Sequence, residues 1–351
     1  MQELDLDRLR PIGLSLAMAR AISLAREQAT GAPLRVTEVH RETLRVHDGA
    51  AEFVSKVLPR LQRSLGDAGE ALAVGDWVLA EPDRHGDWWT HLRIAPQTQL
   101  ARRDMHGLPQ VFASNVDSAL LVMGLDADFS PRRLERYLAL VQGSGVEPVV
   151  VLSKADLCAA ELEQRLDTLR SRLPLGLNTV AINALDNSAA AQLAPWLGAG
   201  QTLVLLGSSG AGKSTLTNTL LGAAVQDTGG VRHGDGRGRH TTTVRSLHQL
   251  PGGACVIDTP GVRTLRPATD GVGAGFDDVT ALARACRFRN CRHNGEPGCA
   301  VREHVGADRL TNFHKLAREQ ERDTMTALQR REQLNVWKVR SRAARARVGG
   351  K

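Results

Sequence analysis

The distribution of hydrophobic and polar residues changes its period along the chain. Between residues 35 and 95, short segments in which apolar and polar positions alternate are separated by Gly, Asp and Pro. Such segments are typical of strands with one buried face, and the residues between them favour turns. The pattern predicts a small β-barrel over 35–95, with the segment 51–62 as one strand, preceded by an N-terminal extension over 1–34.

After a short segment without alternation, the apolar residues follow a longer period. Residues 96–112 lose the alternation and carry Arg102 and Arg103, which predicts a linker that lies over the next domain. From Asn115, apolar runs alternate with helical segments, expected at about 131–143, from about 156 and near 188–197. This βα alternation predicts an α/β fold, a parallel sheet with helices on both faces, over 113–276.

The last segment, 277–351, is rich in Ala, Arg, Leu and Glu and reads as helical around a cluster of Cys and His residues. It ends in a basic run from Lys338 to Lys351, for which a phosphate-binding tail and a solvated end are both consistent with the composition. Because 351 residues exceed what one hydrophobic core usually organises, a division into two or three domains is expected.

A phosphate-binding loop follows an apolar strand and opens an apolar helix at Gly207-x-x-x-x-Gly212-Lys213-Ser214. Glycines let backbone N–H groups approach phosphate oxygens, and the start of the helix adds a favourable partial charge. We expect Lys213 to contact the β- and γ-phosphates and Ser214 to bind Mg²⁺. The predicted nucleotide-binding residues of this loop are Gly207, Ser208, Ser209, Gly210, Ala211, Gly212, Lys213, Ser214 and Thr215.

Two further segments complete the expected phosphate site. Asp258 ends an apolar strand and begins the run Asp-Thr-Pro-Gly, in which the carboxylate can hold the Mg²⁺ shell and the Gly261 N–H can approach the γ-phosphate. The loop Arg-His-Thr-Thr-Thr at 239–243 offers a hydroxyl ligand to Mg²⁺. Thr242 is the preferred ligand, and Thr241 and Thr243 are alternatives.

The choice of base is indicated by Ser153-Lys154-Ala155-Asp156, which follows another apolar strand and is similar to the Asn-Lys-x-Asp motif of GTPases. Asp156 can accept hydrogen bonds from two guanine N–H groups that adenine lacks, while the Lys154 stem packs on the base. Ser153 replaces the usual Asn, which leaves its link to the phosphate loop in question. Asn183 and Ala184 fall where a base-supporting loop belongs, although an ordinary strand end explains them as well.

The order of these motifs is unusual. The base-reading motif precedes the phosphate loop, whereas it follows the Asp-x-x-Gly strand in ordinary small GTPases. The same positions in a sheet can be filled only if the chain is circularly permuted, with the original ends joined near 198–201. The permutation places the end of the second switch, the loop that begins with the Asp-Thr-Pro-Gly run at Asp258, directly before the C-terminal segment.

Three cysteines and one histidine are spaced for a metal. Five cysteines are too few and too unevenly placed for a secreted disulfide scaffold. Three thiolates and an imidazole favour one tetrahedral, structural Zn²⁺ with no open position, and the alternative is a set of reduced apolar cysteines beside a surface histidine. The predicted ligands are Cys286, Cys291, His293 and Cys299.

The charge of the chain restricts its partners only weakly. Lys and Arg number 45 against 38 Asp and Glu, a formal net charge of +7 that suits a phosphate-rich partner but also serves solubility alone. The N-terminus starts acidic and its apolar run is interrupted by Arg20, so we expect no signal peptide or membrane span and a cytoplasmic monomer.

Together, the barrel, the permuted G-motifs and the Cys-Cys-His-Cys cluster resemble the ribosome small-subunit-dependent GTPase A family over about residues 35–320. The resemblance implies an OB-fold barrel, a circularly permuted GTPase domain, and a zinc domain that helps to bind the small (30S) ribosomal subunit. It also implies GTP hydrolysis, stimulated by that subunit and its 16S rRNA, during late subunit maturation. Trp77, Trp88 and Trp89 fit a nucleic-acid face on the barrel, with core packing as the alternative.

The residue that positions water is not obvious. Val262 stands where many GTPases carry a Gln, and valine cannot orient water, so intrinsic turnover should be slow. His240, in the loop that also holds Thr242, is the candidate that the resemblance supports, and a histidine that contacts RNA or solvent is the alternative. The catalytic set is therefore His240, Lys213 and Thr242.

Three functions compete at this point. The first is a GTP-hydrolysing factor of small-subunit maturation. The second is a nucleotide-regulated RNA-binding protein with little turnover, which Val262 and the basic surface suggest. The third, a P-loop ATPase with a zinc scaffold, conflicts with Asp156.

Overall fold

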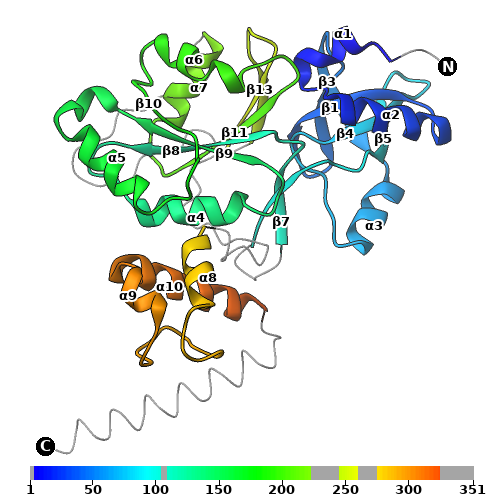
Figure 1. The fold of residues 1–351 in the computed structure, drawn as a ribbon. Coiled ribbons are helices and arrows are strands. Elements are labelled where there is room, and N and C mark those ends of the chain that lie inside the picture. Colours follow the sequence, from blue (N-terminus) through cyan, green and yellow to red (C-terminus); the bar gives the residue numbers. More distant parts are fainter. Residues whose placement is uncertain (1–3, 104–108, 223–244, 260–274, 325–351) are drawn as a thin grey trace, which may run out of the picture.

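A computed structural model of the chain describes residues 4–103, 109–222, 245–259 and 275–324. Figure 1 shows three parts: a barrel at the N-terminal end, a central sheet flanked by helices, and a helical unit beneath α4. Within the described residues, no helix combines the length and the apolar run that crossing a bilayer would need.

The N-terminal part is a closed five-stranded barrel in the order β1-β2-β3-β5-β4, closed by antiparallel pairing of β1 with β4. The predicted OB-like barrel is confirmed. Alternate residues of the strands point inward, and the interior is formed by Leu34, Val36, Leu44, Val46, Val78 and Ala80. The strands are β1 (Ala32–Val39), β2 (Thr43–His47), β3 (Glu52–Val57), β4 (Trp77–Pro82) and β5 (Trp88–Arg93).

The N-terminal extension covers one side of this barrel with two helices, α1 (Leu6–Leu9) and α2 (Leu16–Gln28). Ser15 caps α2, because its hydroxyl accepts a hydrogen bond from the Met18 N–H at 3.1 Å. The apolar face of α2 packs on Trp77, which is fully buried, so this tryptophan has a core role and does not offer its ring to a nucleic acid.

One sequence expectation in this region was wrong. The segment 51–62 is a strand only as far as Val57, and a helix, α3 (Pro59–Asp67), follows it. Pro59 causes the change, since proline cannot donate to a strand ladder but suits the first turn of a helix.

The segment 96–112, predicted to be a linker over the next domain, contains regular structure that the sequence analysis did not predict. It contributes two paired antiparallel strands, β6 (Gln99–Arg103) and β7 (Pro109–Ser114). A bulge between Leu100 and Ala101 shifts the register, which hides the period of two in the sequence.

The central sheet has six strands in the order β10-β9-β8-β11-β13-β12. All neighbouring pairs are parallel except β12 with β13. The helices α4 and α5 cover one face and α6 and α7 the other (Figure 1). The strands are β8 (Ser118–Gly124), β9 (Glu147–Ser153), β10 (Thr179–Ala181), β11 (Thr202–Gly207), β12 (Ser246–Gln249) and β13 (Cys255–Asp258), and the helices are α4 (Pro131–Val141), α5 (Leu162–Arg170), α6 (Ser188–Gln192) and α7 (Lys213–Leu221).

Two of these helices differ from their expected bounds. The helix expected from about Asp156 begins at Leu162, after two 3₁₀ turns, because Cys158 between these turns has a non-helical backbone conformation (φ −134°, ψ 25°). The helix expected at 188–197 ends at Gln192 and gives way to a 3₁₀ turn that contains Pro195, which lacks a donor for an α-helical bond.

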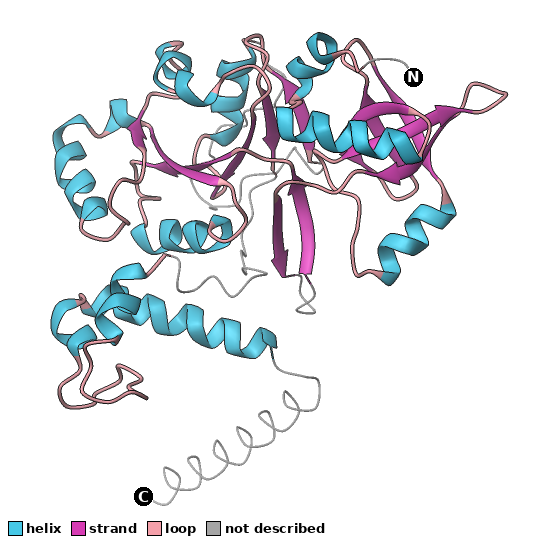
Figure 2. Cartoon of the chain, turned by 45° about the vertical axis from the view of Figure 1, so that its right-hand side comes forward, coloured by secondary structure: helices cyan, strands magenta, loops and turns pink. Residues whose placement is uncertain are grey.

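The C-terminal unit contains α8 (Asp277–Ala283), α9 (Ala300–His304) and α10 (Ala307–Thr324). Its small core is built around Phe276, which is fully buried. Figure 2 shows this unit apart from the sheet, with α10 running beneath the central domain.

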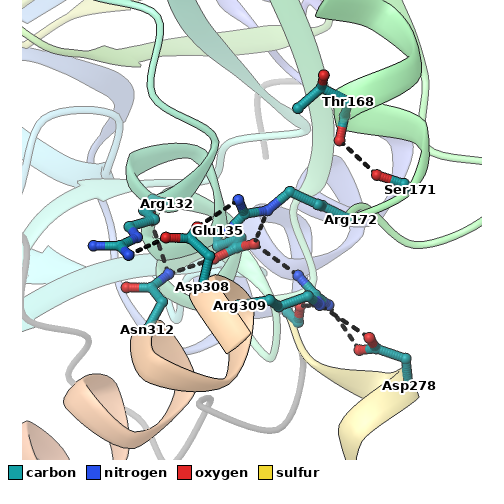
Figure 3. A network of polar contacts seen from close by, with 10 residues as sticks. Arg132, Glu135, Thr168, Ser171, Arg172, Asp278, Asp308, Arg309 and Asn312 are labelled. Carbon is teal, nitrogen blue, oxygen red and sulfur yellow. Dashed lines mark hydrogen bonds and ion pairs between the residues drawn. The ribbon is translucent and has the colours of Figure 1, made fainter. Parts of the chain in front are cut away.

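A buried carboxylate joins this unit to the central domain. Glu135 of α4 is fully buried and accepts hydrogen bonds from Arg172 (2.9 Å), from Arg309 (2.8 Å) and from the amide of Asn312 (Figure 3). Arg309 also donates to Asp278 at 2.7 and 2.9 Å. We call this set the Glu135 junction.

A buried guanidinium joins the barrel to the central domain. Arg35 of β1 is fully buried and donates to the Gly13 carbonyl (3.2 Å), the Asn115 carbonyl (3.0 Å) and the Thr202 hydroxyl (3.2 Å). These acceptors come from the extension, from the start of the central domain and from β11. We call this set the Arg35 junction.

Candidate nucleotide and metal sites

The carboxyl ends of the parallel strands bring the predicted nucleotide motifs to one edge of the sheet. Ser153 ends β9, Gly207 ends β11 and Asp258 ends β13, while Asn183 lies two residues beyond β10. Ligands of open α/β sheets bind at this edge. The structure therefore places together motifs that the sequence scatters over about a hundred residues.

The phosphate loop has the backbone that the motif requires. A Cβ on Gly207 would lie 2.4 Å from the Val122 carbonyl oxygen, so only glycine fits against β8. Gly210 and Gly212 have φ of 83° and 89°, in the left-handed region that favours glycine. The loop leads directly into α7, whose first residue is Lys213.

Lys213 lies inside the loop. Its side chain is buried, and its ammonium donates to the carbonyls of Gly207 (3.1 Å) and Ser208 (2.8 Å). Burial lowers the pKa of Lys213, and the charges of Asp258 and Asp128 act in the opposite direction. The ammonium is thus held at the position where the motif places the phosphates.

Asp258 supplies an acceptor that no group among the described residues uses. It is 2 % exposed, and its Oδ1 has no hydrogen-bond partner within the described part of the chain. Burial raises the pKa of Asp258, against the opposing charge of Lys213. A buried carboxylate oxygen without a partner is costly, and a cation or its bound water would satisfy it.

The predicted base-reading segment, Ser153 to Asp156, is tied to the phosphate loop by Ser153. Its buried hydroxyl donates to the Ala211 carbonyl at 2.6 Å, so the serine forms a link of the kind that its replacement of Asn had left in question. Asp156 is exposed at the rim, where its carboxylate is accessible. Lys154 donates to Asp126 at 2.6 Å.

The loop after β10 supports this segment from the other side. The Ile182 carbonyl accepts from the Ala155 N–H at 3.1 Å, and the Ala184 carbonyl accepts from the Thr219 hydroxyl of α7 at 2.7 Å. The Asn183 side chain accepts from the Leu185 N–H at 3.0 Å and so shapes its own loop.

Several predicted residues lie outside the described part of the chain. They are His240, Thr241, Thr242, Thr243, Gly261 and Val262. The flanking residues are described: Thr259 donates to the Leu205 carbonyl at 2.7 Å, which attaches the end of β13 to β11.

Two carboxylates at this edge were missed by the sequence analysis. Asp126 and Asp128 lie in the loop after β8, where they contact Lys154 and Ser208 respectively. The signal that could have found them is the one that marked Asp258, an acidic residue at the end of a buried apolar strand.

The predicted metal ligands form a compact cluster. The four ligand atoms all lie within 4.8 Å of one another. The His293 Nδ1 is 3.4 Å from the Cys299 Sγ and 3.7 Å from the Cys286 Sγ, and those two sulfurs are 3.9 Å apart. Tetrahedral Zn²⁺ with its usual bond lengths requires edges of about 3.5–3.8 Å, so the donor set fits this ion.

Local backbone geometry holds the cluster. His293 has a φ of 60°, and Gly298 has a φ of 69°. The Glu296 carboxylate accepts from the N–H groups of Arg292 (3.0 Å) and Asn294 (2.8 Å), and such backbone bonds lower the pKa of Glu296 to about 2. The loop between the second and the last ligand is therefore fixed by its own hydrogen bonds.

Comparisons with known proteins agree with this geometry. Residues 94–267 match the family model "RsgA GTPase". A relative from Xanthomonas oryzae pv. oryzae (strain MAFF 311018), named small ribosomal subunit biogenesis GTPase RsgA, is 48% identical over 308 residues, covering 85% of this chain and 82% of the relative.

Two solved structures share the fold. YjeQ from Thermotoga maritima aligns with a TM-score of 0.59 and 23% identity, covering 84% of this chain and 99% of that one. YloQ, described as a circularly permuted GTPase, aligns with a TM-score of 0.55 and 21% identity, covering 85% and 98%. The permuted order of the motifs is thus confirmed, and the chain belongs to the RsgA family of small ribosomal subunit biogenesis GTPases.

Proposed function

We propose that this GTPase binds the small (30S) ribosomal subunit through contacts with its 16S rRNA and hydrolyses GTP late in subunit maturation, as a cytoplasmic monomer. The observation that carries the proposal is the position of Asp258 and Phe276. The chain leaves the nucleotide edge at Thr259 and re-enters the described structure at Gly275, directly before the C-terminal unit. A change at the nucleotide can therefore reach a second domain along one short segment.

In this proposal, Lys213 contacts the β- and γ-phosphates, and Mg²⁺ is bound by Ser214, Thr242 and Asp258. The support is the buried Oδ1 of Asp258, which has no hydrogen-bond partner among the described residues, and the glycine-only backbone at Gly207. The ion would supply positive charge that offsets the negative charge of the phosphates. The other phosphate-loop N–H groups, from Ser208 to Thr215, and that of Gly261 would bind phosphate oxygens.

Guanine would be read by Asp156, with Lys154 packed on the base and Asn183 and Ala184 supporting the loop. The exposed Asp156 carboxylate and the Ser153 link to the phosphate loop support this assignment. GTP should therefore displace a bound fluorescent guanine nucleotide at concentrations at which ATP does not. Equal competition by ATP would contradict the assignment of Asp156.

His240 is proposed to orient the attacking water once the subunit is bound. Replacing His240 with Ala should depress subunit-stimulated turnover by about 100-fold or more and leave GTP affinity unchanged. The measurement is phosphate release in parallel with equilibrium nucleotide binding. Normal stimulated turnover in the variant would remove His240 from the mechanism.

The Cys286, Cys291, His293 and Cys299 cluster is proposed to hold one structural Zn²⁺. Because four protein ligands leave no open position, the ion would stabilise the fold and take no part in the reaction. Metal analysis of the purified chain should give one zinc per chain. Cys299→Ser should lower that content and destabilise the C-terminal unit, whereas Cys158→Ser, at a cysteine distant from the cluster, should not change the zinc content.

Contact with rRNA is supported by the surface around this cluster. Phe288 is 41 % exposed, and the Arg287 guanidinium lies 5.5 Å from its ring. Exposed arginines beside an aromatic ring suit phosphates and bases. Four exposed arginines of this surface have no carboxylate partner in the described part of the chain: Arg284, Arg287, Arg289 and Arg292.

The decisive experiment is GTP turnover by the purified chain, alone and with 30S or large (50S) subunits. Strong stimulation by 30S alone supports the proposal. Slow turnover that neither subunit changes would favour the alternative, a nucleotide-regulated RNA-binding protein with little turnover, to which Val262 pointed.

A further inference from the structure

The loop between β8 and α4 lies between two nucleotide-binding segments, yet it belongs to none of the recognised motifs. Its carboxylates Asp126 and Asp128 are two residues apart. The Asp128 N–H donates to the Asp126 Oδ1 at 3.0 Å, so the first side chain fixes the position of the second. The two carboxylates therefore move as one unit.

Asp126 is directed at the base-reading segment. Its Oδ2 accepts from the Lys154 ammonium at 2.6 Å, and its carbonyl accepts from Arg165 at 3.3 Å. The backbone of Lys154 is in the left-handed region, with a φ of 60°. The carboxylate thus sets where the long lysine side chain lies.

Asp128 is directed at the phosphate loop. Its Oδ2 accepts from the Ser208 hydroxyl, and its Oδ1 accepts from Arg133 of α4 at 2.5 Å. The charge of Asp128 also acts on Lys213, whose pKa it raises against the effect of burial. Through Arg133, the second residue after the start of α4, this carboxylate is anchored to the helix.

The loop itself is firmly attached. The Leu125 N–H donates to the Ser153 carbonyl at 2.9 Å, which fixes the start of the loop to the end of β9. The Arg165 guanidinium lies 5.2 Å from the Phe129 ring, which closes the other side. A loop that is attached at both ends can hold two neighbouring segments in a fixed relative position.

We propose that Asp126 and Asp128 are positioning residues that align the base-reading segment and the phosphate loop, with Asp126 orienting Lys154 over the guanine and Asp128 holding Ser208 and the phosphate loop in its binding geometry. The proposal rests on the assignment of Lys154 and Ser208 to the nucleotide site. It assigns separate halves of the nucleotide to the two carboxylates.

The experiment separates the two halves with GTP and ITP, which differ only in the exocyclic amine of the base. Each competes with a fluorescent GDP analogue on the full chain in the presence of Mg²⁺. Asp126→Asn should weaken GTP by about tenfold and ITP by a smaller factor, because a displaced Lys154 lets the base shift away from Asp156, whose contact with the exocyclic amine only GTP can make. Asp128→Asn should weaken GTP and ITP by the same factor, about three- to tenfold, because only the phosphate side changes.

Asp167→Asn is the matched control, since Asp167 forms an exposed ion pair with Arg170 on α5 and should change neither affinity. Asp126→Glu, which keeps a carboxylate at this position, should retain part of the GTP preference over ITP that Asp126→Asn loses. The proposal is overturned if both variants weaken GTP and ITP equally with a lower unfolding temperature, which marks a structural loop, or if neither variant changes binding.

These outcomes are independent of the ribosomal proposal. Stimulation of the unmodified chain by 30S subunits tests the partner, whereas the ratio of GTP affinity to ITP affinity tests the roles of Asp126 and Asp128 without any subunit. A chain that ignores 30S subunits can still show the split between Asp126 and Asp128, and the reverse also holds.

Discussion

The two junctions each attach a neighbouring domain to the central domain through a buried charge, and the two charges have opposite signs. The Arg35 junction buries a cation among neutral acceptors, and the Arg35 Nε has no hydrogen-bond partner among the described residues. The Glu135 junction buries an anion against two guanidinium groups and an amide. Removing one partner of a buried ion pair costs far more folding free energy than removing one partner of a buried charge that contacts only dipoles.

The pKa shifts follow this difference. Burial lowers the pKa of Arg35, and the charges of Asp117 and Asp76 only oppose this effect. Burial also acts to lower the pKa of Arg309, but hydrogen bonds and the charges of Asp278 and Glu135 outweigh it and raise that pKa. The Arg35 junction thus attaches the barrel through hydrogen bonds from one cation to neutral acceptors, and the Glu135 junction attaches the C-terminal unit through an ionic network.

The largest effect is expected from Glu135→Ala. It leaves Arg172 and Arg309 without their shared carboxylate and should destabilise the junction by about 3–5 kcal/mol. Hydrogen exchange of α8 and α10 should accelerate, while that of the barrel strands stays as it was. The matched control is Glu319→Ala, since Glu319 pairs with Arg136 at the same interface but is more exposed, and its loss should cost roughly 1 kcal/mol or less.

A smaller effect is expected from Arg35→Met. The change removes three hydrogen bonds but also removes a buried cation that has no direct counter-charge, so the cost should be about 1–3 kcal/mol. Thermal unfolding of the barrel reports it. Arg45→Met, on the neighbouring strand, replaces an exposed arginine that is paired with Glu52 and serves as the control. A loss as large as that of Glu135→Ala would erase the distinction between the junctions.

The smallest effect is a difference in acid response. Burial acts to raise the pKa of Asp278, but Arg309 outweighs it and holds that pKa below 3.8, while the Arg132 bond lowers the pKa of Asp308. Carboxylates with depressed pKa values stabilise the folded state above 3.8, and this contribution is lost as the pH falls through the lower folded values. Acid should therefore loosen the Glu135 junction.

The acidic residues near Arg35 have the opposite sign. Burial raises the pKa of Asp76 and of Asp117 above 3.8, in spite of Arg93 and Arg35 respectively. Their ionised forms are disfavoured in the fold, and that cost is relieved as the pH falls through the raised values. Hydrogen exchange from about pH 5 to pH 3 should show the C-terminal unit opening before the barrel. Opening in the reverse order would contradict this assignment of signs.

The sequence predicted those parts of the site whose residues lie close together in the chain. The phosphate loop could be located because Gly207 to Ser214 is one run whose backbone and helix start are local properties. The metal cluster could be located because its four ligands lie within fourteen residues. Asp126 and Asp128 were missed because their partners, Lys154 and Ser208, are distant in sequence and meet only across the sheet edge.

The same reasoning applies to the fold. The period of the apolar residues determined the barrel and the α/β alternation, because each strand and helix buries one face that its own sequence specifies. The permuted order followed from the order of the nucleotide motifs along the chain. The strands β6 and β7 escaped because a bulge at Leu100 broke that period.

Only the tertiary structure decided where the domains are attached. Nothing in the local sequence marks Arg35 or Glu135, since an arginine in a strand and a glutamate in a helix are ordinarily exposed. Their burial is set by partners up to 177 residues away, such as Asn312. A charge is buried only where the folded chain supplies its hydrogen bonds, and that supply is a property of the assembled domains and not of any one segment.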